Sequence, residues 1–118
     1  MSVSKFVMLL MNSRNQAHMF HLTTNSYAQH KALQKYYDGI VPLLDSYAET
    51  YIGTLNGRMT LNQPNSRYIQ DPKKAKKYFQ DLLGRIKKIK LPKDNALKNI
   101  QDDIEGLIKS TIYMLKLK

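Results

Sequence analysis

The sequence contains no cysteine, few acidic residues and no long hydrophobic run. Without cysteine, disulfide bonds and thiolate metal sites are excluded, so His, Asp and Glu are the strong metal ligands that remain. The apolar stretch at residues 6–11 is followed directly by polar residues, and it is too short for a signal peptide or a membrane-spanning helix. These absences predict a soluble intracellular protein that does not contact the membrane.

The sequence has 9 Asp and Glu against 19 Lys and Arg. Because acids are scarce, the formal net charge is +10. Residues 1–60 contribute +2 of this charge and the second half contributes the remaining +8. A balance of this kind favours an anionic partner such as nucleic acid. The length of 118 residues suits one domain, spanning residues 1–118, and is too short for two.

Apolar residues recur at helical spacing in four stretches, which predicts helices over residues 4–22, 26–52, 72–90 and 95–115. Ser26 and Gln29 have the spacing of a capping box at the start of the second helix, and Gly53 can end that helix in a left-handed conformation. Asp71-Pro72 is a good start for the third helix, and Leu91-Pro92 is expected to end it.

Between the second and third helices, residues 53–70 form a long connection rich in turn-forming residues. Its length suits a crossover along the bundle, flanked by two close-set helix pairs. This connectivity is that of ferritin-like bundles, so the sequence predicts an all-α, ferritin-like four-helix bundle. The expected core residues are Phe6, Leu9, Leu10, Ser13, Ala17, Phe20, Leu33, Tyr37, Ile40, Leu44, Tyr47, Tyr51, Ala75, Phe79, Leu82, Ile86, Ile89, Leu97, Ile100, Ile104, Leu107, Ile108, Thr111 and Leu115.

The histidines lie close together in the sequence. His18 and His21 are three residues apart near the end of the first helix and share a face, while His30 lies just inside the second helix. Four polar residues of the second helix fall in one stripe about a quarter-turn wide, beside the core stripe. They are Gln34, Asp38, Asp45 and Glu49. Such a position suits a subunit interface or a metal pocket, although capping histidines and solvated acids produce the same pattern.

The series His18, His30, Gln34, Asp45 and Glu49 resembles the spacing of the ferroxidase ligands in the Dps family of mini-ferritins. In that family the position of Gln34 is an aspartate. The family also usually has a longer linker before the second histidine, so either His18 or His21 matches the first ligand. Residues 16–53 especially resemble small ferritin-like, Dps-like proteins encoded by large tailed bacteriophages, mainly through residues 30–38.

This resemblance implies iron as the cofactor, in a dinuclear site that two subunits share, and therefore at least a dimer. The resemblance implies that first-helix histidines come from one chain and second-helix carboxylates from the other. The implied ligands are Asp45 and Glu49, with His30 together with His18 or His21 completing the coordination. Hard iron ions prefer carboxylate oxygens with a few imidazoles. Glutamine at position 34 offers a neutral oxygen without charge, which weakens the second metal position and argues against full ferroxidase activity.

The third helix has a second candidate site, a group of cations accompanied by the single acid Asp81. Its members are Lys73, Lys74, Lys76, Lys77, Arg85, Lys87, Lys88 and Lys90. Binding of such a group to phosphates releases counterions, which gives salt-dependent DNA binding without sequence preference. A solvated helix face is the structural alternative, since no nucleic-acid-binding motif is present.

Two interpretations of function follow. The first is a Dps-like protein that binds iron at a partly degraded site and associates with DNA through the basic helix. The second is a catalytically inactive helical bundle, used for assembly or as a virion-associated interaction protein. Either protein is expected to be cytoplasmic, which for a phage-encoded chain means the host cytoplasm or a virus particle.

Overall fold

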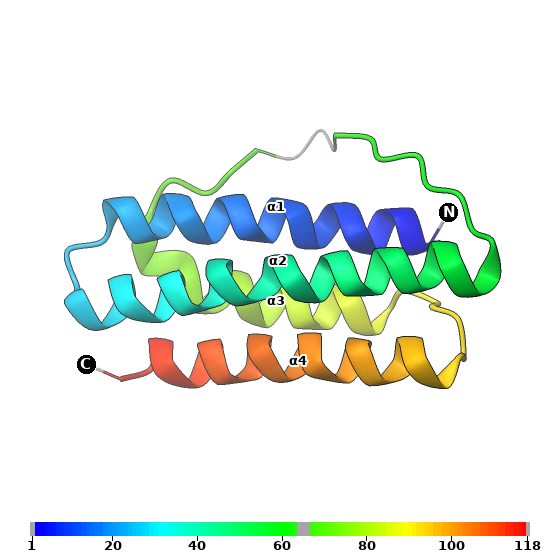
Figure 1. The fold of residues 1–118 in the computed structure, drawn as a ribbon. Coiled ribbons are helices and arrows are strands. Elements are labelled where there is room, and N and C mark those ends of the chain that lie inside the picture. The colour runs from blue at the N-terminus through cyan, green and yellow to red at the C-terminus, as the bar shows by residue number, and fades with distance from the viewer. Residues whose placement is uncertain (1, 64–66, 118) are drawn as a thin grey trace.

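A computed structural model of the chain describes residues 2–63 and 67–117 (Figure 1). Within these residues the protein is all-helical and has no β-strand. The helices are α1 (Ser2–Thr23), α2 (Tyr27–Leu55), the short 3-10 helix η1 (Pro72–Lys74), α3 (Ala75–Lys87) and α4 (Asn95–Leu115).

The four α-helices pack as a ring in the order α1, α2, α4, α3, so α2 and α3 lie at diagonal corners. Figure 1 shows α2 and α3 running in the same direction, because the described parts of the connection between them return alongside α1. The two ends of the chain lie at opposite ends of the bundle. The prediction of an all-helical, four-helix chain with a long second connection is confirmed.

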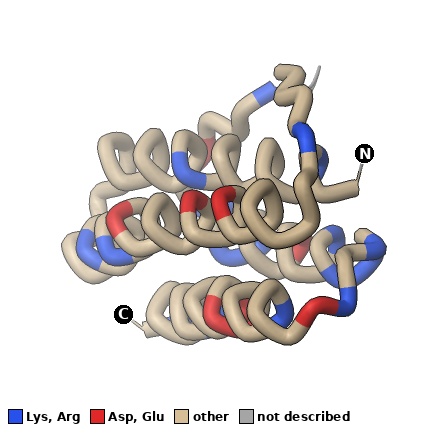
Figure 2. The backbone as a smooth tube through the Cα atoms, turned by 45° about the vertical axis from the view of Figure 1, so that its right-hand side comes forward, with Lys and Arg blue, Asp and Glu red and all other residues tan. Residues whose placement is uncertain are grey.

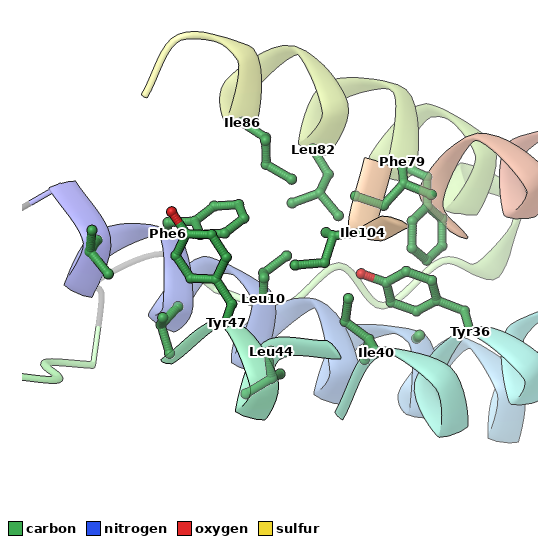
Figure 3. Close-up of a cluster of buried hydrophobic side chains, with 14 of the residues drawn as sticks. Phe6, Leu10, Tyr36, Ile40, Leu44, Tyr47, Phe79, Leu82, Ile86 and Ile104 are labelled. Atoms are coloured by element: carbon green, nitrogen blue, oxygen red, sulfur yellow. The ribbon is translucent and has the colours of Figure 1, made fainter. Parts of the chain in front are cut away.

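All four helices contribute to one core (Figure 3). The fully buried rings of Phe6 and Tyr47 meet edge to face, with centroids 4.9 Å apart, and those of Tyr36 and Phe79 meet in the same way at 4.7 Å. Most of the predicted core residues are buried. Those at its edge, which are only partly buried, are Leu9, Tyr37, Ile89, Ile100, Leu107 and Leu115.

The core of α2 contains Tyr36 in place of the predicted Tyr37. Tyr36 is completely buried, and its hydroxyl lies 2.6 Å from the hydroxyl of Ser13. Because Ser13 donates to the carbonyl of Leu10, Tyr36 is the donor in this pair. Burial raises the pKa of Tyr36 well above its usual range. Because its hydroxyl is hydrogen-bonded, Tyr36 can be buried at little cost. Tyr36 therefore fills the core position, and Tyr37 lies at the edge of the core.

The predicted cap of α2 is confirmed in part. The Ser26 hydroxyl accepts a hydrogen bond from the Gln29 backbone N–H at 3.2 Å. The Gln29 side chain does not return to Ser26, as a full capping box requires. Its amide nitrogen donates instead to the carbonyl of Pro72 at 3.0 Å, and its oxygen accepts from the Thr24 hydroxyl. Gln29 therefore ties the α1–α2 turn to η1.

The predicted end of α2 at Gly53 is wrong. The helix continues to Leu55, and Asn56 adopts the left-handed conformation with φ 48°. Gly53 is exposed, and beyond the adjacent backbone of its own helix nothing lies within 4 Å of the position that a Cβ would take. Nothing around Gly53 therefore ends the helix, and asparagine tolerates the left-handed region better than most residues.

The third helix is shorter than predicted. Asp71 caps η1 by accepting from the Lys73 N–H, and the α-helix starts only at Ala75. It ends at Lys87 instead of continuing to the predicted residue 90. In a continuous helix the ring of Pro92 would clash with the carbonyl four residues earlier, so the helix ends before Pro92.

Candidate functional site

His21 and His30 form a reciprocal pair across the α1–α2 turn. Their rings stack with centroids 3.6 Å apart and an interplanar angle of 19°. The Nδ1 atom of His21 lies 2.7 Å from the carbonyl of His30, and the Nδ1 atom of His30 lies 2.8 Å from the carbonyl of His21. Carbonyls only accept, so each Nδ1 carries a hydrogen. The two side chains fix the turn, and their Nε2 atoms are the ones left for other partners.

His18 lies one turn before His21 on α1. Its ring stacks on that of Tyr37 with centroids 4.5 Å apart and is 6.0 Å from the ring of His21. Partial burial lowers the pKa of His18, and the nearby cation Arg14 lowers it further. The structure therefore brings all three histidines together in one aromatic cluster with Tyr37.

The carboxylates of the predicted metal site lie far from this cluster. Asp45 and Glu49 follow His30 by 15 and 19 residues on one continuous helix, which separates them by about 22 and 28 Å along the axis. Among the described residues, no group of three or more His, Asp or Glu side chains is placed to hold a metal ion. Gln34 is half-buried between the two groups. A single chain cannot assemble the predicted ligand set.

The eight predicted cations lie on η1, on α3 and just beyond it (Figure 2). All eight side chains are exposed. Lys77 pairs with Asp81 at 3.2 Å, and the other described ion pair of the chain, Lys98 with Asp102, lies on α4. Tyr78 turns inward against Phe20 and Phe79 and does not contribute an exposed ring. The result is a basic surface formed almost entirely by long, solvated side chains.

Three residues of α1, Asn12, Asn15 and Gln16, attach the crossover to the bundle, and no sequence pattern signals them. Gln16 is buried, and its amide donates to the carbonyl of Ile69 at 2.9 Å and accepts from the Ile69 N–H at 2.7 Å. The Tyr68 hydroxyl donates to the side chain of Asn12 at 3.1 Å. A lone glutamine at a core position looks like any other polar interruption of an apolar pattern, so its partner is visible only in three dimensions.

Comparison with known proteins places this architecture in a family. A family model described as a family of unknown function, DUF5856, matches residues 21–115. The chain belongs to this family. The DUF5856 match covers His21, His30 and the whole basic surface, whereas His18 lies before it.

A relative of this DUF5856 chain occurs in Enterobacteria phage T4, where it is described as an uncharacterized 14.6 kDa protein in the mobD-ri intergenic region. It is 27% identical over 114 residues, which cover 97% of this chain and 88% of the relative. No solved structure matches the chain. The relation to a phage protein agrees with the predicted resemblance, and neither of these matches names Dps or ferritin. Among the described helices, none combines the length and hydrophobicity needed to cross a bilayer.

Proposed function

We propose that this chain is a nucleic-acid-binding bundle that holds phosphate backbones without sequence preference on η1 and α3. The observation that supports this proposal is the density of exposed cations on one short segment, with Asp81 as its single acid. Each phosphate that a lysine or arginine neutralises releases condensed counterions, and this release gives affinity without reading base edges.

The cations surround the exposed part of α3. Lys73, Lys77 and Lys88 lie on the side of the segment opposite the buried Phe79 and Leu82, as expected from a rotation of about 100° per residue. They would contact a phosphate backbone directly. The function of the DUF5856 chain would then be exercised where phage nucleic acid is found, in the host cytoplasm or in the virus particle.

The salt dependence of binding tests this proposal. Fluorescence anisotropy with a short DNA duplex should give a linear fall of log affinity with log salt, equal for two unrelated sequences. The triple variant Lys73→Ala, Lys77→Ala, Lys88→Ala should reduce the slope by about 2.7, since each contact contributes about 0.9. The matched control Lys5→Ala, Lys109→Ala, Lys116→Ala removes the same charge from exposed positions elsewhere. Equal losses in the two variants, or no binding at low salt, would refute a specific role for α3.

A second candidate function is Dps-like iron binding between two chains. The helix directions and the crossover seen in Figure 1 support it, and so does the histidine pair. Metal-binding histidines commonly donate the ring N–H that is not coordinating to a carbonyl, as His21 and His30 do here. Iron would require Asp45 and Glu49 from a second chain, with Gln34 as a neutral neighbour.

Ferrous iron titration separates this candidate from a catalytically inactive assembly or virion-associated protein. If the site is usable, Gln34→Asp should raise iron affinity and the oxidation rate, because a carboxylate replaces an amide beside a cation. The double variant Asp45→Ala, Glu49→Ala should abolish uptake. If none of the three proteins takes up iron, the iron function is lost and the inactive interaction protein remains.

A further inference from the structure

The outer face of α2 has its charges sorted by sign along the helix. Its only cations, Lys31 and Lys35, lie near the N-terminal end, and its acids Asp38, Asp45 and Glu49 follow (Figure 2). All five side chains are exposed, and none of them is in a described ion pair. The chain has a net charge of +10 and only 9 acidic residues, and three of these acids lie on one helix face without a cation partner in the described structure.

Exposed apolar side chains flank these charges. Leu22 and Tyr27, at the α1–α2 turn, are 68% and 73% exposed. Val41 is exposed near the middle of α2, and Ile52 and Leu55 are exposed near its end. The same two helices thus present apolar groups at both ends of α2 and at its centre, with cations near one end and acids toward the other.

We propose that this face binds a second copy of the chain, with the two α2 helices antiparallel around a two-fold axis near Val41. In a two-fold interface the same patch is used twice, so it must complement itself. With residue 40 opposite residue 40, Lys31 faces Glu49 of the partner subunit and Lys35 faces Asp45 of the partner subunit. Each pair occurs twice, so four acid–base contacts form, whereas a parallel arrangement would set like charges against each other.

The apolar groups agree with the same register. Tyr27 comes opposite Gly53 of the partner subunit, where an exposed glycine with open space above it can receive a ring. Ile52 then lies near the partner's Leu22 and the partner's Tyr27, and Val41 lies beside the axis. The basic surface on α3 is diagonal to α2 and stays away from the contact, which limits the repulsion between the two positive chains.

This inference does not rest on nucleic-acid binding or on iron, so it is tested on nuclease-treated protein in EDTA. Light scattering and native mass spectrometry at micromolar concentration should show a dimer of the parent. The variant Lys31→Glu, Lys35→Glu makes the whole face acidic, and Asp45→Lys, Glu49→Lys leaves Asp38 as its one acid among four lysines. Each variant alone should be monomeric, and an equal mixture of the two should form a heterodimer, because only unlike chains then complement each other.

Matched controls separate the face from net charge. Lys73→Glu, Lys77→Glu on η1 and α3 and Asp102→Lys, Asp103→Lys on α4 make the same charge changes on exposed side chains elsewhere, and both variants should remain dimeric. Circular dichroism verifies the fold of every variant. A monomeric parent, charge variants that stay dimeric, or a mixture that fails to pair would each overturn the proposal.

Discussion

The α1–α2 pair and α3 differ in where they keep polar and apolar residues. In α3 the buried residues are Ala75, Phe79, Leu82 and Ile86, and the cations lie outside. In α1, by contrast, Ser13, Gln16 and His21 are buried, while large apolar groups of α1 and α2 are exposed. The simple amphipathic pattern of α3 serves packing, whereas departures from that pattern in α1 and α2 mark specific contacts and, in the proposed dimer, the surface that the second copy would cover.

The largest effect is expected in the apolar core. Phe79→Ala removes a fully buried ring that packs on Tyr36 and should lower the free energy of unfolding by about 3–5 kcal/mol. Urea denaturation followed by circular dichroism measures it. A loss below about 1 kcal/mol would mean that α3 is not packed as described.

The next largest loss of stability is expected from removing a buried polar contact. Gln16→Ala leaves the N–H and the carbonyl of Ile69 without their partner and should cost about 2 kcal/mol. Protease cleavage in the crossover should become faster in the same variant, because its attachment to α1 is weakened. The exposed control Asn99→Ala should change stability by less than about 0.5 kcal/mol.

Two buried tyrosines on α2 test whether a buried polar group stabilises the fold only when it is hydrogen-bonded. Tyr36→Phe removes the hydrogen bond to Ser13 and should cost about 1 kcal/mol. The buried hydroxyl of Tyr47 has no hydrogen-bond partner in the described part of the chain, so Tyr47→Phe should be neutral or stabilising by up to about 1 kcal/mol. Equal losses from both changes would contradict this difference.

The same tyrosines predict a loss of stability in alkali. Burial raises the pKa of Tyr47 to about 12 and that of Tyr36 still further, whereas both ionise near 10.0 when the chain unfolds. Since the unfolded chain loses these protons first, stability should fall as the pH rises above 10, by up to about 1.4 kcal/mol per pH unit for each tyrosine. Urea titrations between pH 9 and 11 should show a smaller fall in Tyr36→Phe than in the parent.

The smallest effect is expected on the outer sides of α3 and α4. Gly84 and Gly106 lie within these helices and are exposed. Beyond the adjacent backbone of the same helix, nothing lies within 4 Å of the position that an alanine Cβ would take. Alanine at either position should raise the free energy of unfolding by about 0.5–1 kcal/mol, because it reduces the number of conformations open to the unfolded chain. The melting temperature should rise accordingly. Destabilisation by either change would show that the glycine is required for a close contact.

The sequence was sufficient to predict the four helices and most of the core, because apolar spacing determines which face of a helix is buried. It could not choose between Tyr36 and Tyr37, since the choice depends on the hydroxyl of Ser13 on another helix. It also missed the continuation of α2 past Gly53, where no tertiary contact favours an earlier end.

The candidate sites were predictable to different degrees. The exposure of the cations of α3 follows directly from their spacing against Phe79 and Leu82. The grouping of His18, His21 and His30 also follows from the short turn between two helices. Their mutual stacking and carbonyl contacts do not, because these depend on the geometry of the turn. The distance from His30 to Asp45 follows from helix length alone. Because of this distance, an iron site with these ligands would need two chains.

The diagonal placement of α2 and α3 has a consequence for valency. A dimer that pairs through α2 leaves both copies of α3 uncovered, on opposite outer sides of the particle. Such a particle would hold two nucleic-acid segments at once, and the second contact would form at the high effective concentration set by the first. The dimer would therefore crosslink nucleic acid, whereas a monomer with the same basic helix would only coat it.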